Sequence, residues 1–158
     1  MGVTVSGLNG LRSEMLAKLE RIVQAFLDDL DYIGQRAVGY IRNRAAEDSW
    51  YDRTGNLRSS IGYVIVQDGN VIRKGGFDRV DGPERDKTNE DGSQVGLSFA
   101  EEVATEYPKG YALIVVAGME YASLVEKMDN KDVLASGEIF VRKEVKKLVD
   151  KYDKIGRQ

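Results

Sequence analysis

The sequence predicts an α+β domain in which a long N-terminal helix and a C-terminal helix pack on a small, mainly antiparallel sheet with a long charged loop. Three patterns lead to this prediction: helical spacing of apolar residues near both ends of the chain, a β-hairpin signal in the middle, and a seven-residue apolar run. A chain of 158 residues is long enough to bury a substantial core. We therefore expect one domain over residues 1–158, with a flexible N-terminus at residues 1–10.

The first predicted helix runs from Leu11 to about Ile41, where apolar residues recur at steps of three and four. Its expected buried stripe consists of Leu16, Leu19, Val23, Phe26, Leu30, Ile33, Ala37 and Tyr40. About thirty residues make a helix roughly 45 Å long, which is longer than a compact domain of this size needs. Gly34 and Gly39 indicate either a kink or a close packing contact. The pattern favours a long core helix, and the alternative is a helix that also packs on a neighbouring subunit.

A hairpin is predicted in the middle of the chain. The segment 53–60 favours a cap at Thr54 and a short helical turn, in which Gly55 permits a tight turn and Leu57 anchors it to the core. Residues 61–66 are β-branched and aromatic, as is typical of a strand. The turn signal Asp68-Gly69-Asn70 follows, so residues 71–73 should return antiparallel to the first strand.

Residues 75–97 have a different composition, because glycines alternate there with charged residues of both signs. A connection of this length without secondary structure is unusual in a compact domain, so we expect a mobile loop with a functional role. Ser98 is predicted to cap a short helix that ends before Pro108.

The last two elements are a strand and a helix. Residues 111–117 are almost continuously apolar, which predicts a strand covered on both faces. A helical or turn segment is expected at 120–127. Ser136 is predicted to cap the final helix, with Glu138 in its first turn. The apolar positions of this helix are Val141, Val145, Leu148, Tyr152 and Ile155.

The absence of Cys and His restricts the chemistry of the chain. It excludes disulfides, thiolate nucleophiles and Cys-based zinc sites, together with the commonest general base and metal ligand. No phosphate-binding glycine loop, nucleophile elbow or serine–lysine pair is present. A hydrolase that uses carboxylates alone would need convergent acids in a deep pocket. We therefore expect no enzyme, no catalytic residue, no cofactor and no metal site.

Charge and hydropathy bear on the partners. The net charge of −3 gives no overall attraction to nucleic acid, and the longest apolar stretch is far shorter than the roughly 20 residues that cross a bilayer. We expect no membrane partner. From Arg142 to Arg157, however, the final helix carries seven basic residues against three acidic ones, a local charge of +4 that leaves −7 on the rest of the chain. Such a helix fits a solvated amphipathic face, and alternatively a nucleic-acid-binding module. The basic residues are Arg142, Lys143, Lys146, Lys147, Lys151, Lys154 and Arg157.

Two motifs, taken with the order of elements around them, resemble a known family. Thr54-Gly55-Asn56-Leu57-Arg58-Ser59-Ser60-Ile61 lies between the long helix and the first strand, and Tyr121-Ala122-Ser123-Leu124-Val125-Glu126 follows the most apolar strand. This order resembles the neck or tail-completion proteins of long-tailed bacteriophages, over roughly residues 10–155. One departure is Met128, which stands where family members commonly have glycine.

The resemblance implies a non-enzymatic virion part that forms homo-oligomeric rings and contacts connector or tail-tube proteins. Its location would be the virion neck or tail, and the bacterial cytoplasm during assembly. The charged loop would become ordered on assembly. Glu126 would pair with Arg58 or with a neighbouring subunit, or simply be exposed. The residues expected at interfaces are Trp50, Tyr51, Arg53, Arg58, Phe77, Arg79, Tyr121 and Glu126.

Overall fold

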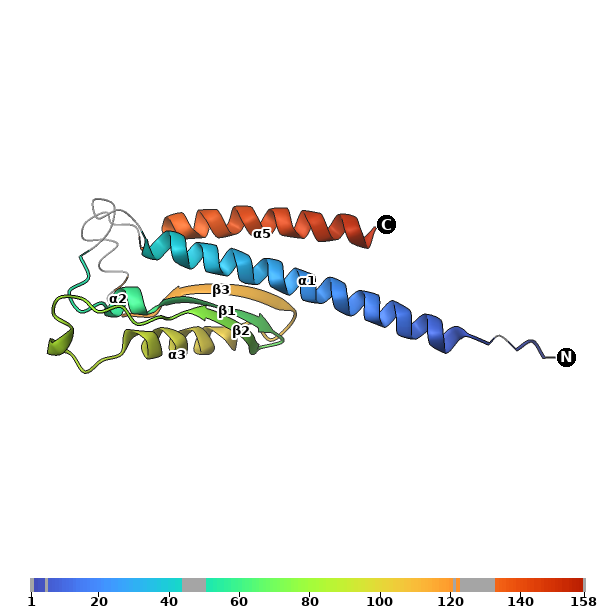
Figure 1. Cartoon of the computed structure of the whole chain (residues 1–158), viewed down its shortest axis with the longest axis horizontal. Coiled ribbons are helices and arrows are strands. Elements are labelled where there is room, and N and C mark those ends of the chain that lie inside the picture. Colours follow the sequence, from blue (N-terminus) through green and yellow to red (C-terminus); the bar gives the residue numbers. More distant parts are fainter. Residues whose placement is uncertain (1, 5, 44–50, 121, 123–132, 158) are drawn as a thin grey trace.

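The computed structural model describes residues 2–4, 6–43, 51–120, 122 and 133–157. It has the predicted α+β arrangement of a long N-terminal helix, a C-terminal helix and a three-stranded antiparallel sheet (Figure 1). The elements in chain order are α1 (Leu8–Arg42), α2 (Asn56–Ser59), β1 (Ile61–Gln67), β2 (Asn70–Gly76), the 3-10 helix η2 (Arg85–Lys87), α3 (Gly92–Ala104), β3 (Tyr111–Ala117) and α5 (Ala135–Gly156).

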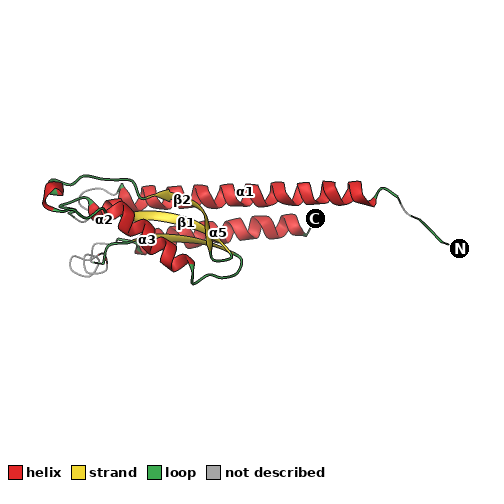
Figure 2. Ribbon diagram, turned by 90° about the horizontal axis from the view of Figure 1, so that it is seen from below, coloured by secondary structure: helices red, strands yellow, loops and turns green. Residues whose placement is uncertain are grey.

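The sheet has the strand order β2-β1-β3, so β1 is central and both other strands are edges. Tyr63 of β1 pairs with Gly75 of β2 and with Val115 of β3. Helix α1 covers one face of the sheet, with α5 beside it, and α3 covers the other face (Figures 1 and 2). The predicted hairpin at Asp68-Gly69-Asn70 is confirmed.

Two hydrophobic cores lie on opposite sides of the sheet. The larger core joins α1 and α5 to the sheet, and the smaller joins α3 to it. Successive residues of β3 point alternately to the two cores, since Leu113 and Val115 pack in the first while Ile114 and Val116 pack in the second. The prediction of a strand with apolar neighbours on both faces is therefore confirmed, although β3 is an edge strand.

Gly34 marks a close packing contact, one of the two alternatives that the sequence left open. A Cβ at this position would lie 2.6 Å from Cγ of Tyr63, whose ring is fully buried. On the other side of the ring, a Cβ at Gly75 would lie 2.7 Å from Tyr63 Cζ. The ring thus occupies a slot between α1 and β2 that only two glycines leave open.

The position and burial of α1 differ from the prediction. The helix begins at Leu8, so three residues expected in a flexible N-terminus are helical. Its buried residues start at Leu27, whereas Leu16, Leu19 and Tyr40 of the predicted stripe are exposed. Leu16 and Leu19 are exposed because α1 is longer than the sheet and α5, so its N-terminal part extends beyond both (Figure 1). Tyr40, near the other end of α1, stacks on Phe140 of α5 instead of entering the core.

Two predicted helix caps are wrong. Helix α3 begins at Gly92, where the Asp91 carboxylate accepts a hydrogen bond from Ser93 N at 3.0 Å. Residues 92–97 are therefore helical, and Ser98 lies inside the helix instead of capping it. Helix α5 begins at Ala135, ahead of the predicted cap Ser136, and has no side-chain cap at its N-cap position, Leu134. Glu138 does lie in the first turn.

Candidate interaction surfaces

The first motif forms a junction between α1, the charged segment 77–91 and α3. Gly55 has a φ of 82°, which favours glycine, and it occupies the N-cap position of α2 that we predicted for Thr54. Asp52 supplies the main side-chain acceptor, because its carboxylate accepts hydrogen bonds from Gly55 N at 2.9 Å and Arg58 N at 2.8 Å. Thr54 Oγ1 accepts a longer bond from Asn56 N at 3.3 Å.

Buried polar side chains of this motif hold the charged segment in place. Ser59 Oγ accepts a hydrogen bond from Val80 N at 2.8 Å and donates to Gly55 O at 2.7 Å. Asn56 Oδ1 accepts bonds from Gly92 N and from the guanidinium of Arg85. The motif therefore has the structural role that was expected of it, and it also holds the charged segment, which its own residues did not indicate. The mobility expected for residues 75–97 stays a prediction.

Charged pairs surround the junction at this end of the molecule. Arg53 forms an ion pair with Glu84, and the hydrogen bond that it donates lowers the pKa of that carboxyl group below its usual value. Arg79 pairs with Asp81 at 2.8 Å. Arg53 and Glu84 line a hollow of about 380 Å³ together with exposed Tyr51.

The predicted interface residues have different surroundings. Tyr51, Arg53 and Arg79 are exposed at the junction. Arg58 is partly buried and donates to Arg42 O at 2.8 Å. Phe77 packs in the smaller core, where a Cβ on Gly62 would meet its ring, so most of that side chain is committed to packing.

Three of the predicted interface residues lie outside the described part of the chain. These residues are Trp50, Tyr121 and Glu126. The predicted segment 120–127 falls largely outside it too, so the pairing of Glu126 with Arg58 stays a prediction.

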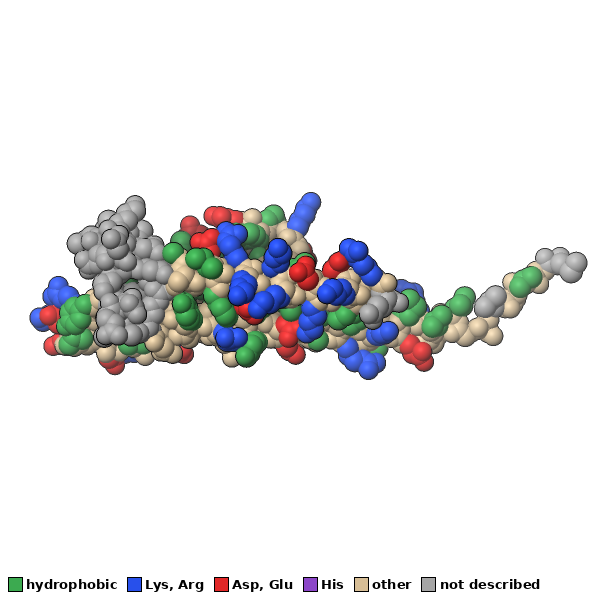
Figure 3. Space-filling view, turned by 90° about the horizontal axis from the view of Figure 1, so that it is seen from above, with side chains coloured by type: hydrophobic (Ala, Val, Ile, Leu, Met, Phe, Trp, Pro, Cys, Tyr) green, Lys and Arg blue, Asp and Glu red, His purple; other side chains and the backbone are tan. Residues whose placement is uncertain are grey.

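A second surface is the projecting part of α1, residues 8–22, which we call the arm. Its apolar side chains Leu8, Leu11, Met15, Leu16 and Leu19 are between 53% and 64% exposed. Figure 3 shows hydrophobic side chains along this tapering end of the molecule. An apolar stripe that is covered in one half of a helix and exposed in the other indicates a missing partner surface. The excess length of the predicted helix was the sequence signal for this surface.

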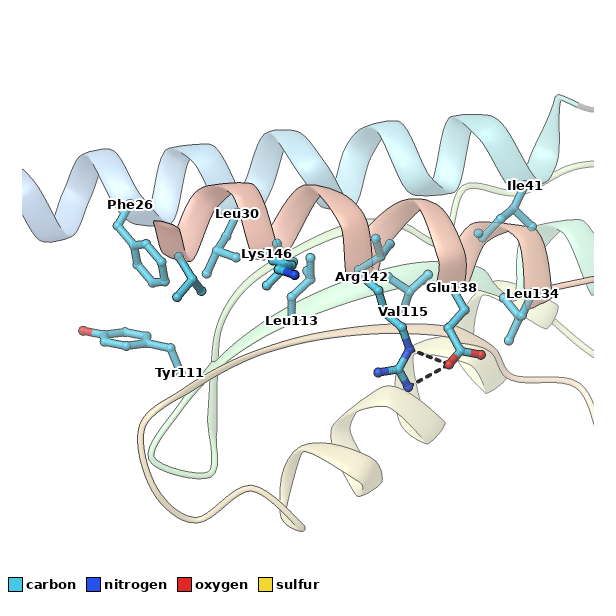
Figure 4. A pocket seen from close by; sticks show the side chains of 14 residues that line it. Phe26, Leu30, Ile41, Tyr111, Leu113, Val115, Leu134, Glu138, Arg142 and Lys146 are labelled. Atoms are coloured by element: carbon cyan, nitrogen blue, oxygen red, sulfur yellow. Dashed lines mark hydrogen bonds and ion pairs between the residues drawn. The ribbon is translucent and has the colours of Figure 1, made fainter. Parts of the chain in front are cut away.

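A third surface is an apolar groove bounded by α1, β3 and α5, with a volume of about 690 Å³ (Figure 4). Phe26 and Leu30 form its floor on α1, and Leu113 and Val115 line it from β3. Its second wall consists of Leu134, which directly precedes α5, and of Gly137, Val141, Val145 and Val149 on α5, with Glu138, Arg142 and Lys146 along the rim. Sequence reasoning missed the groove because three distant segments build it.

The basic residues of α5 gather on its exposed face (Figure 3). Four of these cations form ion pairs with acids: Arg142 with Glu138, Lys147 with Glu144, Lys151 with Asp29, and Arg157 with Asp153. The hydrogen bond from Lys151 is the largest cause that lowers the pKa of Asp29. These pairs reduce the positive charge that the helix offers to a partner.

Among the described residues, no group of three or more acidic side chains is arranged to hold a metal ion. In the same part of the chain, none of the helices combines the length and apolar character needed to cross a membrane. In comparisons with known proteins, no family model, no curated protein and no solved structure matches this chain.

Proposed function

We propose that this protein is a structural assembly component of a phage or prophage virion, which joins the head connector to the tail or completes the upper end of the tail. It acts through ring-forming contacts with its own copies and with neighbouring connector or tail-tube proteins. The proposal combines the resemblance carried by residues 54–61 and 121–126 with the surface properties of the fold.

The observation that carries the proposal is the exposed apolar arm of α1. Five large aliphatic side chains on one helix are exposed over residues 8–19, while the same helix is well buried from Leu27 onward. Exposure of so many apolar groups on one helix is unfavourable in water, so the arm favours a protein partner. This supports an assembly role over a role that depends on a single closed pocket.

The junction around residues 51–60 offers a second contact surface of different character. Its ion pairs are exposed and its backbone is held by buried Asn56 and Ser59, so charged side chains project from a fixed support. Polar rims of this kind suit contacts that must form in one orientation. We assign this surface to neighbouring proteins of different sequence.

The test is native mass spectrometry of the protein mixed with phage connector and tail-tube proteins. We expect complexes with at least one of them, in addition to homo-oligomers at high protein concentration. A protein that stays monomeric and binds neither partner would contradict the proposal.

The alternative is a nucleic-acid-binding module that uses the exposed basic face of α5 (Figure 3). Binding of that kind would weaken steeply with salt and would be lost when Lys143, Lys146 and Lys147 are replaced. Because several α5 cations are already paired with acids, we expect no retention of DNA or RNA at 50 mM salt.

A further inference from the structure

The arm and the groove have complementary shapes. The arm presents a wide apolar stripe, with Leu8, Leu11, Met15 and Leu19 at steps of three and four residues and Leu16 beside them. The groove has two apolar walls, one on β3 and one on α5. A wide apolar stripe needs apolar contacts on two sides to be buried. The groove provides these contacts from β3 and from α5, in the space that α1 and α5 leave open over β3 (Figure 4).

The arm cannot fill the groove of its own chain. Residues 8–42 form one continuous helix, and Phe26, Leu30 and Ile41 of that helix line the groove. The arm runs beyond the sheet and past the C-terminal end of α5, where residues 14–22 border a hollow with Lys151 and Ile155 (Figure 1). Only the arm of another molecule can reach the groove without breaking α1.

The lengths and the residue steps also agree. The arm from Leu8 to Leu19 spans roughly 17 Å at 1.5 Å per residue, and the groove wall from Leu134 to Val149 spans roughly 23 Å. If the two helices run antiparallel, Leu8 faces Val149, Leu11 faces Val145 and Met15 faces Val141, while Leu19 comes close to Gly137, where the wall is lowest.

Charges at the rim favour this direction. Glu14 and Lys18 lie four residues apart on the arm, at the edge that borders a hollow with the C-terminal end of α5 of the same chain. Glu138 and Arg142 lie four residues apart at the groove rim, where they form an ion pair with each other. An antiparallel arm brings Glu14 opposite Arg142 and Lys18 opposite Glu138. A parallel arm in the corresponding register would bring like charges together.

We propose that the arm of one copy, residues 8–22, inserts antiparallel to α5 into the apolar groove of a second copy. This inference rests on the proposed self-assembly and names the surfaces that make it. The contact is heterologous, because each molecule donates one arm and accepts another. Repetition of a heterologous contact closes into a ring when the rotation between copies allows it.

The absence of cysteine from the chain gives a direct test. Leu11→Cys in one full-length sample and Val145→Cys in a second are mixed at high concentration and oxidised. We expect a disulfide-linked dimer of the two variants, at least tenfold above the product from a control mixture of Leu11→Cys with Glu101→Cys, which lies on α3 across the sheet. A second pair at the rim, Lys18→Cys with Glu138→Cys, checks the register without altering the apolar wall.

Charge reversal supplies a second readout. Exchanging the arm charges, with Glu14→Lys and Lys18→Glu, should slow cross-linking of the apolar pair by roughly three- to tenfold at low salt. Adding Glu138→Lys and Arg142→Glu on the groove side should restore the rate.

Each outcome separates the proposals. No mixed dimer from either cysteine pair would overturn the arm-in-groove contact. Rapid disulfide formation by Leu11→Cys alone would overturn it in favour of arm–arm pairing. In both cases a complex with connector or tail-tube protein would leave the proposed function standing. Failure of every association would instead refute that function.

Discussion

The slot around Tyr63 predicts opposite effects for the same substitution at two positions of α1. Replacing glycine with alanine inside a helix stabilises it by about 0.5–1 kcal/mol when the methyl group has room. At Gly39 the nearest atom to an added Cβ is Asn43 Nδ2 at 4.0 Å, so Gly39→Ala should stabilise the protein by up to that amount.

At Gly34 the added methyl group would meet the Tyr63 ring, and the ring cannot move away. Gly75 closes the other side of the slot, and the Tyr63 hydroxyl donates a hydrogen bond to Asp31 Oδ1 at 2.7 Å. Overpacking of this kind costs about 1–3 kcal/mol, which exceeds the gain in helix propensity. We expect Gly34→Ala to destabilise the protein by about 1–2 kcal/mol.

Urea unfolding followed by circular dichroism measures both variants. Because the gain in helix propensity is common to both, the difference between their unfolding free energies isolates the packing cost, about 1–3 kcal/mol. A Gly34→Ala variant as stable as Gly39→Ala would refute the description of the slot.

Three further predictions concern the junction, the buried phenol and α5. Asn56→Ala should destabilise the protein by about 1–3 kcal/mol in urea unfolding, because Gly92 N and the Arg85 guanidinium lose their acceptor; unchanged stability would contradict this role. Burial and the hydrogen bond to Asp31 raise the pKa of Tyr63 to about 12, so its contribution to stability is complete below pH 10 and is lost as the pH rises toward 12. Tyr63→Phe should lack this alkaline loss when unfolding is measured across that range, and an identical loss in both proteins would exclude it. The intact protein should not be retained on DNA at 50 mM salt, because four cations of α5 are paired with acids, and retention would instead support the nucleic-acid-binding alternative.

Much of the fold could be predicted from local patterns. The hairpin was predictable because alternation and the Asp68-Gly69-Asn70 turn are both encoded by neighbouring residues. The start of α3 was not predictable, because Gly92 and Gly96 in its first two turns have low helix propensity. Both residues are buried in the structure, and a Cβ on Gly92 or Gly96 would meet the backbone of residues 56–60. Tertiary packing therefore decides that boundary.

The surfaces were less predictable than the fold. The sequence indicated that the first helix was longer than a compact domain needs, and the arm is this excess length. The sequence placed Leu16 and Leu19 in the core, although both are exposed. Periodicity identifies the apolar face of a helix, but it does not show how far along the helix other elements pack against that face. The groove depends on the positions of α5 and β3 relative to α1, which no local pattern contains. The packing of Phe77 was not predictable either, because nothing in its own segment shows that Gly62 makes room for its ring.

The central claim is that this chain is an assembly part that works through contacts between its copies. Negative-stain electron microscopy of the full chain at high concentration, alone and with the connector or tail-tube protein, tests this claim most directly. Closed rings of the protein, free or seated on its partner, are the predicted result. Isolated monomers in every sample would contradict the account.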